Sequence, residues 1–265
     1  MSKPLLILGL GHLGEVVAKE AMLTRKVIAT TRRPEALAAI AEAGMTPVLV
    51  QPNVCDAYPD ADVLVTFPPD GTTDQLLASA SLRNRTVVYI STTGVYGPHA
   101  HHVTDSTPVD VNDARARIRL DAEAAWRDVG ATILRAPAIY GPKSGLHLRI
   151  ARGDFKMVED GESYVSRIHV EDLAQIALAV LDHKVRGETF VIGDAEPATQ
   201  RTVIEWLCER MNAPLPASVP RDEAPASLRA NRRVDGTRVL TKLGLTLRYP
   251  TFRDGLDACI AAMQH

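Results

Sequence analysis

The chain has 265 residues, of which 46% are hydrophobic and 23% are charged, as in an ordinary globular protein. Thirty lysines and arginines against 32 aspartates and glutamates give a formal net charge of −2, which leaves no basic footprint for nucleic acid or an anionic membrane. No apolar run reaches membrane-spanning length, and the start lacks the form of a signal peptide. Three scattered cysteines without metal spacing indicate buried thiols in a reducing compartment, so we expect a cytoplasmic protein without a metal site.

The first predicted element is a buried strand at Lys3–Leu8, and a glycine-rich turn follows it at once. The turn reads Gly9-Leu10-Gly11-His12-Leu13-Gly14, and an amphipathic helix follows from Glu15 to Leu23. In this context Gly9 permits the tight turn, Gly11 lets backbone amides approach a pyrophosphate, and Gly14 lets helix and strand pack closely. The helix N-terminus presents its partial positive charge to the anion. The pattern favours dinucleotide binding over a glycine turn that merely joins two elements.

The second strand, Lys26–Thr31, ends where an acidic residue would hold the ribose 2′-hydroxyl of NAD. No acidic residue is there, and the chain reads Thr31-Arg32-Arg33 instead. Arginine forks suit a 2′-phosphate, so the sequence predicts NADP as the cofactor. The alternative is that both arginines are solvated loop charges.

Strands and helices continue to alternate through the rest of the N-terminal half. The expected elements are a helix at Glu35–Ala43, a strand at Pro47–Val50, a strand at Ala61–Phe67 ended by Pro68-Pro69, a helix at Asp74–Leu82, and a strand at Thr86–Ile90. In the helix at Asp74–Leu82 we expect Leu76, Leu77 and Ala80 to face inward. The alternation predicts an α/β fold with a doubly wound parallel sheet, the Rossmann arrangement.

The second half completes this sheet and adds a lobe. The expected elements are a helix at Asn112–Val129, a strand at Ala131–Arg135, a loop at Ala136–Pro142, a helix running through Leu181 after Arg167–Leu173, a strand at Glu188–Gly193, and two short helices at Thr202–Met211 and Phe252–Met263. A proline-rich connection separates the last two helices. We therefore predict a Rossmann domain at 1–195, with 143–165 contributing to the substrate cleft, and a small C-terminal α/β lobe at 196–265.

Four motifs together resemble the extended short-chain dehydrogenases, the NAD(P)-dependent epimerase/dehydratase family. They are the glycine turn, Ile90-Ser91-Thr92-Thr93-Gly94-Val95-Tyr96-Gly97, Leu134-Arg135-Ala136-Pro137-Ala138-Ile139-Tyr140-Gly141-Pro142, and Arg167-Ile168-His169-Val170-Glu171-Asp172-Leu173. They cover most of the chain in the family's order. The resemblance implies that Thr92 hydrogen-bonds the reacting carbonyl or alcohol; a hydroxyl that satisfies local backbone is the alternative. The expected cofactor contacts are Gly9, Gly11, His12, Leu13, Gly14, Thr31, Arg32, Arg33, Phe67, Pro68, Arg119 and Pro137.

The family's Tyr-x-x-x-Lys pair is missing where the resemblance places it. Its two positions fall on Arg115 and Arg119, and the segment Asn112–Asp121 contains neither tyrosine nor lysine. Arginine stays protonated at any working pH and cannot exchange a proton as the tyrosine does. The chain is thus similar to atypical members that have lost the pair. We expect Arg119 at the nicotinamide ribose and Arg115 at a substrate carboxylate or phosphate; a solvated basic helix face is the alternative.

Other residues are candidates for the missing proton donor. Tyr96 and Tyr140 follow strand ends, where the family lines its substrate pocket, although each is also typical of a packed aromatic. His99, His101 and His102 occupy a following loop, and histidine titrates near neutral pH.

These patterns predict an NADP-dependent oxidoreductase with a remodelled active site. Its expected substrate is a small carbonyl or alcohol compound, either neutral or anionic. The alternative is a catalytically silent NADP-binding sensor or regulatory protein. A nucleotide-sugar epimerase or dehydratase is less favoured, because the segment after Pro197 is small.

The family also suggests a homodimer. Its interface would use the helices Asp74–Leu82 and Asn112–Val129, with Ala122, Ala124, Ala125 and Trp126 as small and aromatic surface. The alternative is a monomer in which these residues only cover the sheet.

Overall fold

The computed structural model describes residues 2–98, 100–225 and 228–263. It divides the chain into two compact units. Unit 1 consists of Met1–Thr92, Val111–Arg135 and Leu173–Phe190, and unit 2 consists of Thr93–Asp110, Ala136–Asp172 and Val191–His265. Residues 143–165 and 196–265, which the sequence assigns to the substrate side, both belong to unit 2.

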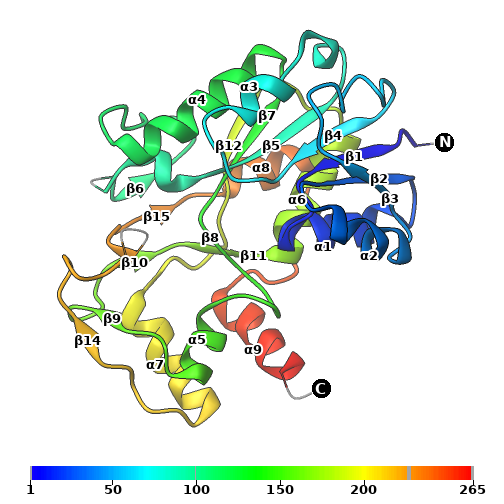
Figure 1. The fold of residues 1–265 in the computed structure, drawn as a ribbon. Helices are drawn as coiled ribbons and strands as arrows, with labels where there is room; N and C mark the ends of the chain where they lie inside the picture. Colours follow the sequence, from blue (N-terminus) through cyan, green and yellow to red (C-terminus); the bar gives the residue numbers. More distant parts are fainter. Residues whose placement is uncertain (1, 99, 226–227, 264–265) are drawn as a thin grey trace. The chain divides into compact units, whose positions relative to one another are not determined.

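Unit 1 is built on a seven-stranded sheet (Figure 1). Its order is β12 (Thr189–Val191), β7 (Thr132–Ala136), β5 (Val87–Thr92), β4 (Asp62–Val65), β1 (Leu5–Leu8), β2 (Val27–Thr31) and β3 (Thr46–Leu49). The pairings of β1 with β2 and β4, of β2 with β3, and of β4 with β5 are parallel. The predicted doubly wound Rossmann sheet is confirmed, and its strand order reverses between β1 and β4, where such folds bind ligands.

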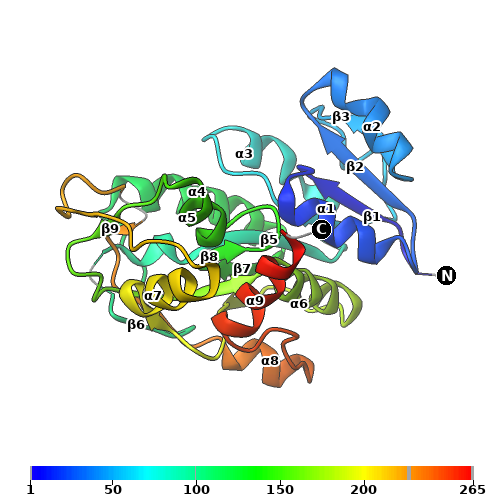
Figure 2. The same ribbon diagram turned by 90° about the horizontal axis from the view of Figure 1, so that it is seen from below.

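Helices cover both faces of this sheet. In Figures 1 and 2, α3 (Thr73–Leu77) and α4 (Ala114–Asp128) lie on one face, and α1 (His12–Ala21), α2 (Leu37–Glu42) and α6 (Val170–Asp182) lie on the other. Successive strand residues point to opposite faces, so Leu6 and Leu8 join the core beneath α3 and α4. Leu5 and Ile7 are equally buried but do not belong to that core. Burial on both faces explains why β1 reads as a continuous apolar run.

Helix α4 uses its aromatic and small residues internally. Trp126 is fully buried, its ring stacks on Tyr89 at 6.0 Å, and its Nε1 donates to Asp74 Oδ1 over 2.7 Å. Ala122 is also buried, whereas Ala124 is exposed. The expectation that Ala122 and Trp126 offer surface to a second copy is wrong, because they cover the sheet. The homodimer itself stays a prediction.

The third helix is shorter than expected. It ends at Leu77, and a 3-10 turn follows at Ala80–Leu82. Leu77 is buried, but Leu76 is 53% exposed and Ala80 is exposed too. The expectation that Leu76 and Ala80 face inward is wrong, because the helical period stops before Ala80 and Leu76 lies on the outer side of the single turn.

Unit 2 has its own core. Its helices are α5 (Leu146–Arg152), α7 (Gln200–Met211), α8 (Thr237–Leu243) and α9 (Phe252–Ala262), of which the sequence predicted only α7 and α9. Helices α5, α7 and α9 pack together through Ile150, Val203, Leu207, Phe252 and Leu256.

Short strand pairs complete unit 2. They are β8 (Ala138–Tyr140) with β11 (Arg167–His169), β10 (Tyr164–Val165) with β13 (Ala198–Thr199), β9 (Met157–Val158) with β14 (Ser218–Val219), and β6 (His102–Val103) with β15 (Arg233–Val234). The expected loop at Ala136–Pro142 is wrong at its centre, because β8 pairs in parallel with β11.

The cysteines of both units are buried. Cys55 in unit 1 and Cys208 and Cys259 in unit 2 are all buried and unbonded to one another. Burial raises the pKa of Cys55 to about 11 and that of Cys259 to about 12.

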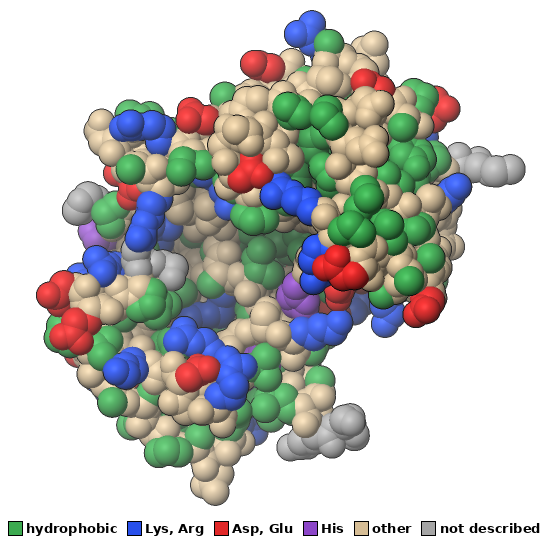
Figure 3. Space-filling view, viewed as in Figure 1, with side chains coloured by type: hydrophobic (Ala, Val, Ile, Leu, Met, Phe, Trp, Pro, Cys, Tyr) green, Lys and Arg blue, Asp and Glu red, His purple; other side chains and the backbone are tan. Residues whose placement is uncertain are grey.

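Acidic and basic side chains are intermixed over the face drawn in Figure 3. Among the helices of the described ranges, none has the length and apolarity needed to cross a bilayer.

A buried ionic group joins α4 to strands β5 and β7. Glu123 is fully buried, and Arg135 approaches it with Nε 3.0 Å from Oε1 and Nη2 2.8 Å from Oε2. Ser91 donates to Oε1 over 2.5 Å and Arg127 to Oε2 over 2.6 Å. Burial alone would raise the pKa of Glu123. The hydrogen bonds and the charge of Arg135, together with the hydrogen bond from Ser91 and the charge of Arg127, outweigh burial and lower the pKa of Glu123.

Removing Glu123 should therefore destabilise unit 1 strongly. Glu123→Ala leaves the Arg135 guanidinium buried without its carboxylate, and we expect a loss of roughly 3–5 kcal/mol in the free energy of unfolding. Arg127→Ala is the matched control: its side chain is 38% exposed, and an exposed partner is worth about 1 kcal/mol or less. Urea denaturation followed by Trp126 fluorescence, in a Trp206→Phe background, measures both. Equal losses for the two variants would contradict the buried ion pair.

Candidate functional site

The glycine turn after β1 is fixed by close packing at two of its glycines. Gly9 has φ +94°, and a Cβ there would lie 2.9 Å from the Cβ of Phe67. A Cβ on Gly14 would lie 2.9 Å from the carbonyl oxygen of Gly9. The amide of Gly9 donates to Thr30 Oγ1 over 3.0 Å. The turn is thus held against both neighbouring strands, and no side chain fits at either glycine.

Gly11 is different, because the space beside it is open. A Cβ there would meet no atom of the described residues within 4 Å. Gly11 is the N-cap of α1 and supplies no side-chain cap, so the amides of His12, Leu13 and Gly14 have no acceptor within the helix. The Leu13 side chain is buried and His12 is half-buried, so Leu13 would contact a ligand through its backbone. A helix start without a side-chain cap is suited to an anion.

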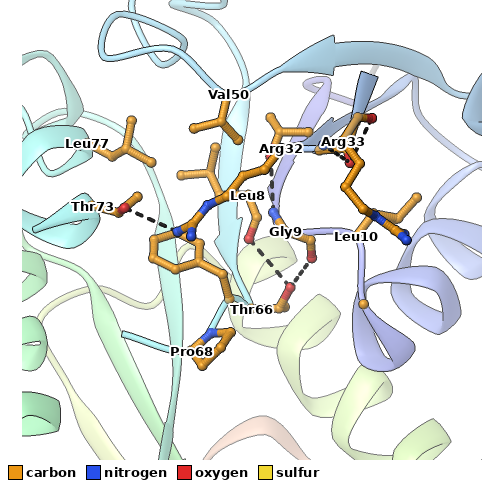
Figure 4. Close-up of a pocket in the computed structure, with 14 residues that line it drawn as sticks. Leu8, Gly9, Leu10, Arg32, Arg33, Val50, Thr66, Pro68, Thr73 and Leu77 are labelled. Carbon is orange, nitrogen blue, oxygen red and sulfur yellow. Dashed lines mark hydrogen bonds between the residues drawn. The ribbon is translucent and has the colours of Figure 1, made fainter. Parts of the chain in front are cut away.

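A pocket of about 360 Å³ opens at the carboxyl ends of β1, β2 and β4, at the point where the strand order reverses (Figure 4). It contains seven residues that the sequence predicted for the cofactor, namely Gly9, Gly11, Thr31, Arg32, Arg33, Phe67 and Pro68. Further lining residues that the sequence reasoning missed include Thr30, Val50, Thr66, Thr73 and Leu77.

Thr66 shows which sequence feature could have identified the missed lining residues. It directly follows β4, and its hydroxyl donates to the carbonyl of Gly9 and lies 3.5 Å from that of Leu8 (Figure 4). A hydroxyl at the end of the strand beside β1 is a detectable pattern once the strand order is known. Val50 shares this position at a strand end, because it directly follows β3.

The two arginines after β2 point in different directions. Arg32 crosses the pocket mouth, with Nη2 2.7 Å from Asp70 Oδ2 and 3.1 Å from Thr73 Oγ1, and its Cζ lies 5.9 Å from the Phe67 ring centre. Arg33 donates its backbone amide to Thr31 Oγ1 over 3.1 Å, and its guanidinium lies towards Leu10, away from Thr73 (Figure 4). Among the described residues, no ion pair involves Arg33.

These features fit an adenine dinucleotide. The first-turn amides of α1 suit a pyrophosphate, the apolar side chains of Val50 and Leu77 suit a flat base, and the arginines suit a phosphate on the ribose. No Asp or Glu follows β2 to accept from a ribose 2′-hydroxyl.

Arg115 and Arg119, which the sequence analysis assigns to the family's Tyr and Lys positions, lie on α4, within unit 1. Arg119 donates from Nη1 to the hydroxyl of Tyr89 over 3.2 Å. Tyr89 is fully buried, and burial raises its pKa to about 12. Arg115 is in the first turn of α4, its side chain is exposed, and its amide is capped by Asp113 at 2.7 Å. Thr92 is half-buried at the end of β5.

The remaining candidates belong to unit 2. Tyr96 is buried in the 3-10 turn Thr93–Tyr96. The carbonyl of Thr93 in this turn accepts from Arg232 at 2.8 Å, and that of Gly97, just after the turn, accepts from it at 2.7 Å. Tyr140 ends β8, and its buried hydroxyl meets no hydrogen-bond partner in the described part of the chain. Burial raises the pKa of Tyr140 well above its usual value. Pro137 joins β7 to β8.

His101 and His102 are the two described histidines of the predicted loop after Tyr96. His101 Nδ1 lies 3.1 Å from the carbonyl oxygen of Asn231, His102 is exposed on β6, and His99 lies outside the described residues. Within residues 2–98, 100–225 and 228–263, no three His, Cys, Asp or Glu side chains are placed to hold a metal ion.

Sequence reasoning also missed two buried charges in unit 2. Burial raises the pKa of Asp194 to about 7, against the lowering effect of the nearby Arg167 charge. Arg167 is itself buried, and its Nη1 has no hydrogen-bond acceptor among the described residues. The sequence analysis uses Arg167 only as the first residue of a family motif, and Asp194 directly follows the predicted strand Glu188–Gly193, so neither stands out as a buried charge.

Comparison with known proteins agrees with this geometry. The family model for the NAD dependent epimerase/dehydratase family matches residues 71–193. The 3-diazoavenalumate denitrifying reductase of Streptomyces sp is 29% identical over 156 residues, which are 54% of this chain and 51% of that protein. The chain spans about half the length of the curated relatives it matches.

Two solved structures extend the likeness along the whole chain. A functionally unknown conserved protein from Silicibacter pomeroyi DSS is 31% identical, with a TM-score of 0.85 and coverage of 98% of this chain and 99% of that one. MoeE5 in complex with UDP-glucose and NAD is 18% identical, with a TM-score of 0.81 and 99% coverage of both chains, and it shows the fold alone. With its Rossmann sheet, its glycine turn and these relatives, the chain belongs to the NAD-dependent epimerase/dehydratase family.

Proposed function

We propose that the chain is an NADP-dependent oxidoreductase of the extended short-chain dehydrogenase type, with a remodelled active site that acts on a small carbonyl or alcohol. One observation carries the proposal: a single pocket has the uncapped start of α1 on one side and two arginines, with no carboxylate after β2, on another. Pyrophosphate and 2′-phosphate recognition both need such groups. The Streptomyces relative is named as a reductase, which supports the reaction class.

When bound, the nicotinamide would supply or accept the hydride. The Thr92 hydroxyl, at the carboxyl end of β5, would hydrogen-bond the substrate oxygen. No tyrosine in the chain is followed four positions later by lysine, so proton exchange depends on another group. Arg115 and Arg119 would contribute fixed positive charge, which favours an anionic substrate.

The alternative, a catalytically silent NADP-binding sensor, rests on the contact of Arg119. Its guanidinium is engaged by the buried Tyr89 hydroxyl inside unit 1, and a phenol with a pKa near 12 is a poor proton donor at neutral pH. Turnover separates the two functions.

NADPH should bind at least about tenfold more tightly than NADH, a difference of roughly 1.4 kcal/mol. The double variant Arg32→Ala/Arg33→Ala should remove most of this preference and leave NADH affinity nearly unchanged, because it removes only the groups that suit the 2′-phosphate. Arg83→Ala, in the segment that precedes β5, removes a positive charge outside the pocket lining and is the control. Fluorescence titration measures all three proteins. Equal affinity of the wild type for both cofactors would contradict the NADP assignment.

The glycines of the turn should separate folding from binding. A methyl group at Gly11 points into open space, so Gly11→Ala should keep its melting temperature but weaken NADPH by at least about tenfold, since the methyl lies in the path of the pyrophosphate. Gly14→Ala should instead cost about 1–3 kcal/mol of stability, because its methyl meets the Gly9 carbonyl. Thermal melts and titrations of both variants provide the test, and a Gly11→Ala protein that binds NADPH normally would contradict the site.

Turnover tests the role of Thr92. With a panel of keto acids, aldehydes and neutral ketones, the wild type should oxidise NADPH, and Thr92→Val should lower kcat about a hundredfold or more because the isosteric side chain lacks the hydroxyl. Thr92→Ser keeps the hydroxyl and should retain most of the rate. Tight NADPH binding by the wild type with no turnover on any substrate would favour the sensor.

A further inference from the structure

The side chain of Arg32 is the bridge between two loops at the mouth of the pocket. It comes from the loop after β2 and reaches Thr73 at the start of α3, whose Oγ1 accepts at 3.1 Å (Figure 4). It also reaches Asp70 in the segment between β4 and α3, whose Oδ2 accepts at 2.7 Å. Both charged side chains keep solvent access, with Arg32 55% and Asp70 34% exposed. The pair can therefore open without burying a charge.

Asp70 is held in place by its own neighbours. Its Oδ1 accepts from the amides of Thr72 at 3.1 Å and Thr73 at 2.8 Å, and its Oδ2 accepts from Thr73 Oγ1 at 2.6 Å. These hydrogen bonds, with the contact from Arg32, hold the pKa of Asp70 far below its usual range. The carboxylate is a fixed negative charge at the start of α3, whatever Arg32 does.

This arrangement makes Arg32 and Arg33 unequal towards a phosphate. A phosphate on the ribose must compete with a fixed carboxylate for the Arg32 guanidinium, whereas no ion pair among the described residues engages Arg33. A ribose hydroxyl carries no charge and meets no such competition.

We propose that Asp70 is a specificity residue for the cofactor: as the counter-ion of Arg32, it lowers the affinity of the pocket for 2′-phosphorylated adenosine and leaves unphosphorylated adenosine unaffected. The inference rests on the proposed cofactor function and concerns its selectivity. Arg33 supplies the attraction that discriminates for the 2′-phosphate, and the Arg32–Asp70 pair restrains it.

Asp70→Asn tests this with little change of shape, because asparagine keeps the acceptor used by the Thr72 and Thr73 amides. The probes are adenosine 2′,5′-bisphosphate and adenosine 5′-monophosphate, which differ only in the 2′-phosphate. By calorimetry, the variant should bind the bisphosphate about fivefold more tightly than the wild type does, the size expected for release of an exposed ion pair. Its affinity for the monophosphate should stay within about twofold.

Two further variants separate the mechanism from a general effect of charge. Asp60→Asn removes an exposed carboxylate that precedes β4, at the opposite end of that strand, and should change neither affinity. In an Arg32→Ala background, Asp70→Asn should give no gain for the bisphosphate, because no guanidinium is left to release.

The outcomes are distinct. A gain for both probes, a gain for neither, or a gain that persists without Arg32 overturns the role of Asp70 while leaving the cofactor proposal standing. A wild-type protein that binds neither probe, nor NADPH or NADH, overturns the proposed function and this inference together.

Discussion

The contact between Gly14 on α1 and the carbonyl oxygen of Gly9 is the constraint from which the site follows. Because no methyl group fits between them, the first turn of α1 lies directly over the end of β1. Gly9 in turn lies against Phe67, so the segment after β4 is pressed to the same turn. Gly11 at the start of α1, the aromatic ring after β4 and the arginines after β2 then line one pocket because three strand ends converge there. Close packing of small residues thus sets the positions of groups that themselves make few contacts.

Sequence reasoning recovered the elements whose signals are local. Strands β1, β2 and β5 are apolar runs buried on both faces, and such runs need no knowledge of their partners to be recognised. Strand β8 was missed because Pro137, Gly141 and Pro142 surround it, and only its pairing with β11 makes it a strand. The length of α3 was overestimated because Ala80 continues the helical spacing in sequence although the chain has already turned. Local pattern carries no information about either event.

The same division holds within the candidate site. The glycines after β1 and the arginines after β2 could be predicted from the sequence, because the chemistry of the site requires these residue types at these positions. The contacts of those arginines are not readable, since Asp70 is 38 positions away from Arg32 and meets it only through the adjacency of β1 to β2 and β4. The partner of Arg119 is hidden for a related reason: Tyr89 reads as one more apolar strand residue, and only the packing of α4 on β5 brings its hydroxyl to the guanidinium. A side chain's identity is local information, and its partner is a property of the fold.

The three buried thiols give each unit its own chemical reporter. A thiol reacts with an alkylating reagent as the thiolate, and burial both shields these sulfurs and keeps them protonated. Modification therefore has to wait until the surrounding structure opens. The alkylation rate of Cys55 measures how often the Rossmann unit opens, and those of Cys208 and Cys259 do so for the other unit. The native sequence thus carries built-in probes with which the opening free energies of the two units can be compared, with and without a ligand.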